Sequence, residues 1–299
     1  MLLRVLQDIF GGWKARARGD NRLLAAEYLQ QGAASRSAGR LQEARDHFKR
    51  AAELAPDDAG CLSAFTEVDD LLRAHTRFPG ETYFAVLARI LDTVKPRTYL
   101  ETGVAAGDSL RLVQAPTRAV GIDPEPQIVA PLSPNQRVFA ETSDAFFASR
   151  DVRAELGGLP IDLAFIDGMH HFEYALRDFA NIERHATPRS SVLIHDVYPL
   201  DRATADRERQ RAFWSGDVWR LIVLLKKYRP DLAVHTIATA PTGLALVRRL
   251  DPASRLLLER HDQLRDEFLA LDYAWLEDDM AAKLNLFPND WAKIRTLLA

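Results

Sequence analysis

The feature that most constrains the fold is an alternation between short apolar runs and helical stretches, which begins near Phe78. Five of the runs are strand-like, and they cover residues 98–101, 118–122, 136–140, 163–166 and 191–194. Helical stretches are expected between them, because parallel strands must be joined by crossovers of about a dozen residues or more. The alternation predicts an α/β fold with a doubly wound, mainly parallel sheet.

The pattern near the end of this alternating region, after residue 218, differs from that of the first five runs. A predicted helix over residues 218–228 is followed by two strand-like runs, 232–238 and 244–249, on either side of Pro241-Thr-Gly243. Two such runs joined by a short turn indicate an antiparallel hairpin, which completes a predicted sheet of seven strands. A plain dinucleotide-binding fold would not end in this way. Residues 251–299 are predicted to be helical and, being rich in aromatics, to form a lid or an oligomer contact.

Residues 21–76 have the pattern of paired helices. They predict two short antiparallel helices that break at residues 37–40, and a further helix over 62–74. The small, aromatic and proline positions resemble one tetratricopeptide repeat, and they are Gly32, Gly39, Arg40, Glu43, Ala44, Phe48, Ala51, Ala52, Leu54 and Pro56. Because a lone repeat leaves one face uncovered, the segment is interpreted either as a helical cap or as a site for a protein partner or a second copy of the chain.

Residues 1–20 are predicted to be a separate amphipathic arm. Apolar residues at helical spacing precede Lys14, Arg16 and Arg18. The favoured interpretation is a helix packed on the protein or on a second subunit, and a helix lying on a membrane surface is the lesser alternative. The chain is therefore divided into residues 1–20, 21–76, 77–250 and 251–299.

Charge and composition exclude several classes of protein. The formal net charge of −3 provides no general basic field, so nucleic acid is not expected as a partner. The single cysteine, Cys61, cannot form an intramolecular disulfide, which favours a reducing, cytoplasmic setting. No apolar run approaches the roughly 20 residues that cross a bilayer, so no transmembrane segment is predicted.

A glycine-bearing turn follows the first predicted strand. Gly103 and Gly107 would let a ligand approach the backbone closely, and a helix is expected directly after them. Glu101 is suited to meeting an ammonium group or to ordering the loop. Asp123 ends the next predicted strand, where a carboxylate can accept hydrogen bonds from both hydroxyls of a ribose.

These residues resemble the motifs of class I S-adenosylmethionine-dependent methyltransferases, Glu101-x-Gly103-x-x-x-Gly107 followed by Val120-Gly-Ile-Asp123. The resemblance spans roughly residues 78–249 and makes 77–250 a methyltransferase domain. It implies S-adenosylmethionine as cofactor, and it places Ser143 and Asp144 near the adenine.

A nicotinamide dinucleotide site is the main competing interpretation of this turn. Such a site favours a third glycine and a helix N-terminus free for the pyrophosphate. Asp108 would instead cap the expected helix and repel a pyrophosphate. A tight turn in an α/β domain that binds no ligand is the remaining alternative.

Polar residues follow two further strands, Asp167 and His170 after the first, and His195 and Asp196 at the end of the second. Since the carboxyl ends of adjacent parallel strands face one crevice, these four side chains are expected to converge. His170 is the candidate general base, because an imidazole exchanges protons near neutral pH. His171 and His185 are expected on helix surfaces.

The pattern also resembles the metal-dependent sugar and catechol O-methyltransferases. That resemblance implies a Mg²⁺ site at Asp167 and Asp196, with His195 at a position where sugar-modifying members have a carboxylate. Imidazole is a poorer Mg²⁺ ligand than an oxygen donor. The metal is therefore weakly bound Mg²⁺, a softer ion such as Mn²⁺, or not required.

The predicted reaction is methyl transfer from S-adenosylmethionine to a hydroxyl of a small molecule, such as a sugar or a natural product. A non-catalytic scaffold that keeps the fold and binds a partner through its N-terminal helices is the alternative from another class. Some relatives labelled as hydroxylases are similar around residues 166–170, and they too resemble methyltransferases. On the helix after Asp167, Tyr174 and Asp178 are expected on a solvated face, and residues 202–211 are interpreted as a substrate loop or a solvated linker.

Overall fold

The computed structural model describes residues 21–299, so the predicted arm over residues 1–20 lies outside the described residues. The chain forms two compact units. The first contains the residues up to 76 together with 211–213, and the second contains residues 77–210 and 214–299. The second unit thus includes both the segment 77–250 and the segment 251–299.

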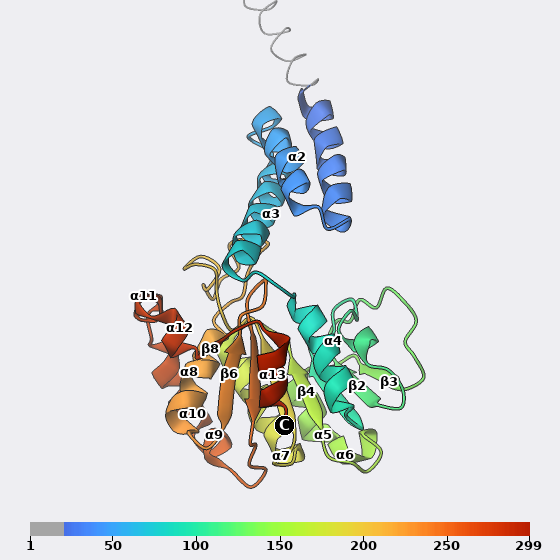
Figure 1. The fold of residues 1–299 in the computed structure, drawn as a ribbon, viewed down its shortest axis with the longest axis vertical. Coiled ribbons are helices and arrows are strands. Elements are labelled where there is room, and N and C mark those ends of the chain that lie inside the picture. Colours follow the sequence, from blue (N-terminus) through green and yellow to red (C-terminus); the bar gives the residue numbers. More distant parts are fainter. Residues whose placement is uncertain (1–20) are drawn as a thin grey trace, which may run out of the picture. The chain divides into compact units, whose positions relative to one another are not determined.

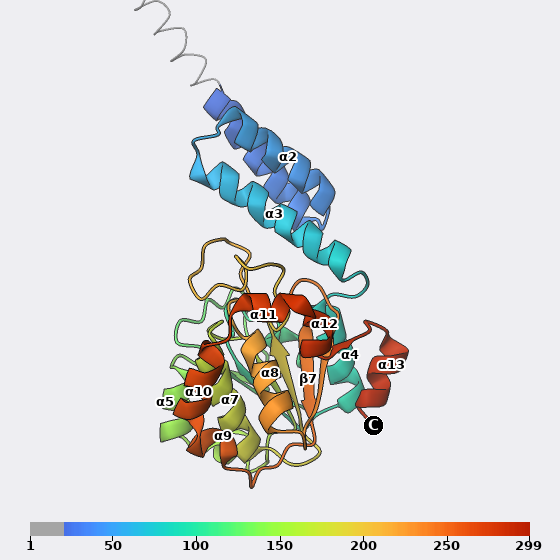
Figure 2. The same ribbon diagram turned by 90° about the vertical axis from the view of Figure 1, so that its left-hand side faces the viewer.

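The first unit consists of helical residues 21–37, α2 (Leu41–Leu54) and most of α3 (Ala59–Arg77). The chain turns between the first two helices at Gly39, whose φ of +74° suits glycine. Gly32 lets the helices approach closely, because a Cβ atom there would lie 2.5 Å from the Phe48 ring. Ala44, Phe48 and Val68 form a small buried cluster. The helices lie side by side in Figures 1 and 2.

The second unit is built on an eight-stranded sheet in the order β3-β2-β1-β4-β5-β7-β6-β8. The strands are β1 (Thr98–Thr102), β2 (Arg118–Ile122), β3 (Gln136–Phe139), β4 (Leu163–Ile166), β5 (Ser191–His195), β6 (Ala233–Ile237), β7 (Leu244–Arg248) and β8 (Leu286–Phe287). The first five are mutually parallel, and β7 lies antiparallel between β5 and β6. The predicted parallel sheet with its terminal hairpin is therefore confirmed.

The eighth strand differs from the sequence prediction, which expected only helix after residue 250. Strand β8 pairs in parallel with β6 through Thr236 and Ile237. Two residues are too few to show an alternating pattern, and their pairing is decided by a strand about 50 residues earlier in the chain.

Helices cover both faces of the sheet (Figures 1 and 2). On one face, α4 (Tyr83–Val94) and α13 (Trp291–Leu297) pack on Tyr99, Phe165 and Leu193. The other face is covered by α5 (Ser143–Ser149), α6 (Val152–Glu155), α7 (Phe172–His185), α8 (Trp219–Tyr228), α9 (Leu256–Glu259) and α10 (His261–Leu269). Two short helices, α11 (Tyr273–Asp278) and α12 (Met280–Lys283), precede β8.

Two expected crossover helices are missing from the second unit. Between β1 and β2 the chain forms only the 3₁₀ turn η1 (Leu110–Leu112), and between β2 and β3 it forms an irregular loop. Prolines explain both departures, since Pro116 follows η1 and the loop contains Pro124, Pro126, Pro131 and Pro134. The prediction of a helix directly after Gly107 was therefore wrong.

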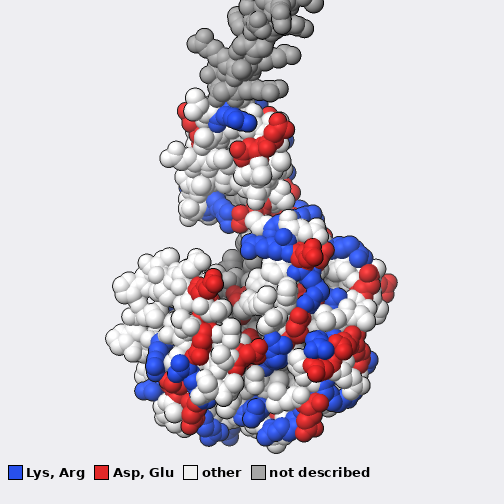
Figure 3. Space-filling model, turned by 180° about the vertical axis from the view of Figure 1, so that it is seen from behind, with Lys and Arg blue, Asp and Glu red and all other residues white. Residues whose placement is uncertain are grey.

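None of the helices in residues 21–299 is long and apolar enough to cross a membrane. On the face shown in Figure 3, acidic and basic side chains are interspersed rather than gathered by sign. This distribution accords with the small net charge of the chain.

Candidate active site

A cavity of about 470 Å³ opens at the carboxyl ends of β1, β2 and β4. Four of the predicted cofactor residues line it, namely Gly103, Asp123, Ser143 and Asp144. Asp167 and His170 line the same cavity. The predicted cofactor residues and part of the predicted reaction site thus share one space.

Gly103 lies directly against the backbone that follows β4. Its φ is +84°, and a Cβ atom there would lie 2.0 Å from the carbonyl oxygen of Asp167. Asp123 fixes the loop that follows, because its Oδ2 accepts hydrogen bonds from the backbone N–H groups of Val104 and Ala105, at 2.8 and 2.9 Å. The loop after β1 is therefore shaped by the end of β2.

Glu101 lies behind this loop and does not line the cavity. It is fully buried and accepts hydrogen bonds from the Tyr99 hydroxyl at 2.7 Å and the Ser109 hydroxyl at 3.2 Å. Burial raises the pKa of Glu101 to about 8, although both hydroxyls act to lower it. Of the two roles considered for Glu101, these contacts support ordering of the loop.

Gly107 also lies outside the cavity wall, and its N–H donates to the carbonyl of Val104 at 2.8 Å. The neighbouring Asp108 pairs with Arg111 on η1. Because no α-helix starts here, the expectation that Asp108 caps a helix was wrong. The helix-based argument against a pyrophosphate therefore does not apply to this loop.

Ser143 and Asp144 form the first turn of α5, whose N-cap is Thr142. The Thr142 hydroxyl accepts a hydrogen bond from the N–H of Ala145 at 3.2 Å. The Asp144 carboxylate pairs with Arg177 of α7 through two hydrogen bonds of 3.0 and 2.9 Å. This pair joins α5 and α7 at the rim of the cavity.

The polar residues after β4 and at the end of β5 converge as the strand arrangement requires. His170 Nε2 lies 3.0 Å from Asp196 Oδ2. His195 Nδ1 lies 3.1 Å from Asp167 Oδ1 and 3.3 Å from Asp196 Oδ2. Asp196 has a φ of +57°, a left-handed conformation that is uncommon for an aspartate. The two acids and two imidazoles form one cluster.

The other nitrogen of His170 is fixed by the backbone. Nδ1 lies 3.0 Å from the carbonyl oxygen of Trp214, which can only accept, so Nδ1 carries a proton and donates it. The Trp214 ring stacks on the imidazole at 5.1 Å between centroids. Gly216 permits this approach, because a Cβ atom there would lie 1.8 Å from the carbonyl oxygen of His170. No local sequence pattern indicates this contact.

Both nitrogens of His195 are donors. The Thr242 hydroxyl donates its proton to Asp196 Oδ1 at 2.7 Å, so at 3.2 Å it accepts from His195 Nε2. Nδ1 faces the two carboxylates and donates to Asp167. The imidazole of His195 is therefore positively charged, and the Tyr83 ring stacks on it at 3.9 Å.

The electrostatics of the cluster agree with this protonation. Burial alone would lower the pKa of His195, but the charges of Asp196 and Asp167 outweigh burial and raise it to about 10. Burial acts to raise the pKa of Asp196, yet His170 and His195 hold it below its ordinary value. An imidazolium has no lone pair for a metal, so these contacts argue against the predicted role of His195 as a ligand. The group with metal-type spacing is instead Asp167, His170 and Asp196, whose donor atoms lie within 4.8 Å of one another.

Tyr174 and Asp178 were expected on a solvated face of α7, and that expectation was wrong. Both line the cavity, and Asp178 is only 5% exposed. Helical spacing places residues four apart on one face, but it does not tell whether that face meets water or a cavity.

Residues 202–211, which were interpreted as a substrate loop or a solvated linker, form ion pairs with α7. Arg207 forms ion pairs with Glu173 and Asp217, each with a shortest separation of 2.6 Å. Asp217 is fully buried, and its Oδ1 accepts a hydrogen bond of 2.7 Å from the N–H of Phe172. These contacts hold the beginning of α7, and hence His170 and His171, in place.

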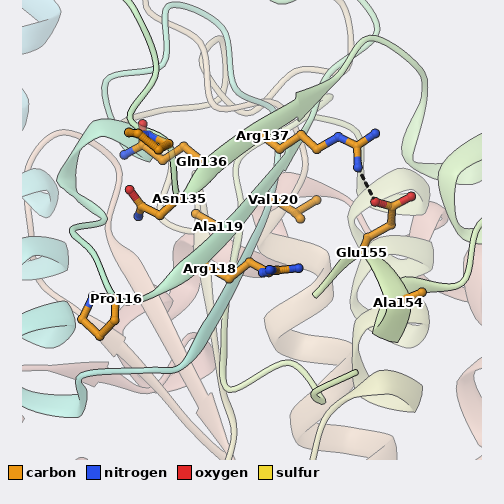
Figure 4. A pocket seen from close by; sticks show the side chains of 10 residues that line it. Pro116, Arg118, Ala119, Val120, Asn135, Gln136, Arg137, Ala154 and Glu155 are labelled. Carbon is orange, nitrogen blue, oxygen red and sulfur yellow. Dashed lines mark hydrogen bonds and ion pairs between the residues drawn. The ribbon is translucent and has the colours of Figure 1, made fainter. Parts of the chain in front are cut away.

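A second cavity, of about 340 Å³, lies beside β2, β3 and α6 (Figure 4). Its polar side chains include Arg137, which donates to Glu155 at 2.7 Å, and Gln136, which donates to the carbonyls of Leu110 and Val113. None of the predicted site residues lines this cavity. It therefore adds nothing to the predicted chemistry.

Residues 100–197 match a family described as a methyltransferase domain. This stretch contains the Gly103 turn, Asp123 and the cluster of Asp167, His170, His195 and Asp196. The match agrees with the sheet order, in which an antiparallel β7 is inserted beside β5. Over residues 100–197 the chain is therefore similar to methyltransferase domains.

Several solved structures match about two thirds of this chain at low sequence identity. Cofactor-bound Rv0187 from MTB is 16% identical, with a TM-score of 0.45 over 62% of this chain and 89% of that chain. The O-methyltransferase TomG from Streptomyces achromogenes, in complex with SAM, is 20% identical, with a TM-score of 0.44 over 61% and 89%. An O-methyltransferase from Bacillus cereus, in complex with SAH, is 13% identical, with a TM-score of 0.42 over 67% and 95%. A comparison with curated proteins gave no match.

Proposed function

We propose that this enzyme transfers the methyl group of S-adenosylmethionine to a hydroxyl of a small molecule, such as a sugar or a polyhydroxylated natural product, with His170 as the general base. The observation that carries the proposal is the position of His170, which lines the cofactor cavity while its Nε2 lies 3.0 Å from Asp196. The acceptor oxygen attacks the methyl carbon, the bond between carbon and sulfur breaks with its electrons left on sulfur, and the hydroxyl proton passes to Nε2.

The contacts of His170 suit this role. Its Nδ1 proton is held by the Trp214 carbonyl, so Nε2 is the nitrogen that exchanges a proton, and His170 acts as base in the form in which Nε2 carries none. The resulting imidazolium is stabilised by the buried carboxylate of Asp196. General-base catalysis of this kind contributes about 10²–10⁴-fold to a rate.

A metal-assisted form of the same reaction is the second candidate, and one observation favours it. Imidazoles that bind metals commonly donate their other N–H to a backbone carbonyl, as His170 does to Trp214. Asp167, His170 and Asp196 would hold the ion, and Mn²⁺ suits a mixed oxygen and nitrogen set better than Mg²⁺. The ion would lower the pKa of the acceptor hydroxyl, and His170 would then be a ligand rather than the base.

Methyl transfer to a panel of sugars and polyphenols distinguishes these candidates, with His170→Ala compared with wild type. We expect kcat to fall about 10²–10⁴-fold, with the affinity for S-adenosylhomocysteine within about threefold of wild type. His185→Gln, at the opposite end of α7, is the matched control and should keep full activity. Wild-type turnover by His170→Ala would exclude His170 as base. If EDTA abolishes wild-type activity and Mn²⁺ or Mg²⁺ restores it, the metal-assisted form is correct.

The role of residues 21–76 remains a proposal with two forms, a helical cap or a surface for a partner or a second copy of the chain. The cytoplasmic setting inferred from the single cysteine likewise remains a prediction. Sedimentation of the full chain across a range of concentrations would detect self-association.

A further inference from the structure

One buried acid in the cofactor cavity has no part in the reaction proposed above. Asp178 lines the cavity from α7 and is 5% exposed. Its Oδ1 is buried, and no residue within 21–299 provides a hydrogen bond to it. A buried acceptor without a donor costs about 1–3 kcal/mol, so such an atom at a cavity wall indicates a missing donor.

No cation within the described part of the chain neutralises this carboxyl by a direct pair. The adjacent Arg177 points to Asp144 instead, with contacts of 3.0 and 2.9 Å. Burial raises the pKa of Asp178 to about 6, and the hydroxyls of Ser143 and Thr102 act in the opposite direction. At neutral pH the group is therefore an ionised carboxylate whose Oδ1 has no hydrogen-bond donor among the described residues.

The position of Asp178 in the cavity indicates which part of the cofactor it would contact. The methyl-bearing sulfur must approach His170 and Asp167, and the ribose is expected at Asp123. Adenine and the amino-acid chain leave the ribose on opposite sides, so the adenine extends away from His170. Ser143, whose hydroxyl affects the pKa of Asp178, begins α5 on that side of the cavity.

We propose that Asp178 recognises the adenine of the cofactor, its buried carboxylate accepting a hydrogen bond from the 6-amino group. The inference rests on the proposed function insofar as S-adenosylmethionine must occupy this cavity. Asp178 is then a specificity residue rather than a catalytic residue, because it selects a purine with an amine at position 6. Tyr174, one turn earlier on the same face of α7, lines the wall beside it.

The test uses S-inosylhomocysteine, in which an oxygen replaces the 6-amino group of S-adenosylhomocysteine. Calorimetry on the full chain measures the affinity for each ligand. The wild type should prefer S-adenosylhomocysteine by about tenfold or more, since the inosine oxygen faces a carboxylate and offers it no proton. In Asp178→Asn the amide presents an N–H to that oxygen, so the preference should fall at least about tenfold or reverse.

Asp92→Asn, an exposed acid on α4, is the control and should keep the wild-type preference. A thermal unfolding curve confirms that each variant is folded. An Asp178→Asn chain that is folded and keeps the wild-type preference would overturn the inference, as would a wild type that binds both ligands equally. If the folded wild type binds neither ligand, the proposed function fails as well, and this outcome is distinct from the other two.

Discussion

Among single residues, Gly103 is a position that we expect to tolerate substitution poorly. A Cβ atom there would lie 2.0 Å from the Asp167 carbonyl oxygen, and the φ of +84° strains any other residue. Gly103→Ala should therefore destabilise the chain by about 1–3 kcal/mol and weaken S-adenosylhomocysteine binding more than about tenfold. Urea unfolding and calorimetry measure the two effects.

Gly158 provides the matched control for this substitution. Its φ is +83°, but a Cβ atom there would meet nothing within 4 Å. Gly158→Ala should show the backbone strain of about 1–2 kcal/mol without loss of ligand affinity. Equal affinities of the Gly103 and Gly158 variants would show that the close approach to Asp167 does not shape the cofactor loop.

Asp178 should also make stability depend on pH. Its pKa is about 6 in the folded protein, against an ordinary value of 3.8, so the folded state binds the proton more tightly than the unfolded chain. The stability linked to this proton is fully present below pH 3.8 and is lost as the pH rises through about 6.

The substitution Asp178→Asn removes this loss of stability at high pH, because the amide does not titrate. The variant should be more stable than wild type by about 1–3 kcal/mol at pH 7.5, and by less at pH 5. Urea unfolding at the two pH values, without ligand, measures the difference. A gain that is the same at both values would contradict the assignment of the shifted pKa to Asp178.

Among the elements, α7 depends on a contact from outside the helix. Its N-cap residue, His171, makes no side-chain capping bond, and Asp217 accepts the Phe172 N–H in its place. Asp217 also pairs with Arg207, and its N–H donates to the His170 carbonyl at 3.1 Å. One buried carboxylate therefore joins the segment that contains Trp214 to the start of α7.

Asp217→Ala should lower the free energy of unfolding by about 2–4 kcal/mol, because it leaves a partly buried arginine and a helix N-terminus without their acceptor. It should also lower kcat, since His170 loses its fixed position. Asp266→Asn, an exposed acid on α10, should change stability by less than about 0.5 kcal/mol. A loss below about 1 kcal/mol for Asp217→Ala would show that other contacts position α7.

At the scale of the whole molecule, one of the two compact units contains the whole lining of the cofactor cavity. Every residue that lines the cofactor cavity lies between Thr102 and Asp178, within the second unit. A chain that starts at Arg77 should therefore bind S-adenosylhomocysteine within about threefold of the full chain. Calorimetry on both chains, with circular dichroism to verify folding, tests this expectation. A folded short chain that fails to bind would show that residues before Arg77 contribute to ligand binding.

The sequence by itself determined seven of the eight strands and the similarity of residues 100–197 to a methyltransferase domain. Strands β2 and β4 have the predicted bounds, and the other strands differ by one or two residues, because apolar runs and turn residues are local signals. The position of Gly103, Asp123, Asp167 and His170 followed from the rule that ligands bind at the carboxyl ends of such strands. The same local signals failed for β8 and for the stretch after Gly107, where too few residues, or prolines, interrupt the pattern.

Only the tertiary structure decided the protonation of the site and the environment of its acids. The Trp214 carbonyl that fixes His170 is 44 residues away in sequence, and the Thr242 hydroxyl that fixes His195 is 47 residues away. Asp178 appeared solvated because a helical pattern shows only which residues share a face. Hydrogen-bond donors, acceptors and burial are set by contacts between distant segments, and those contacts exist only once the chain has folded.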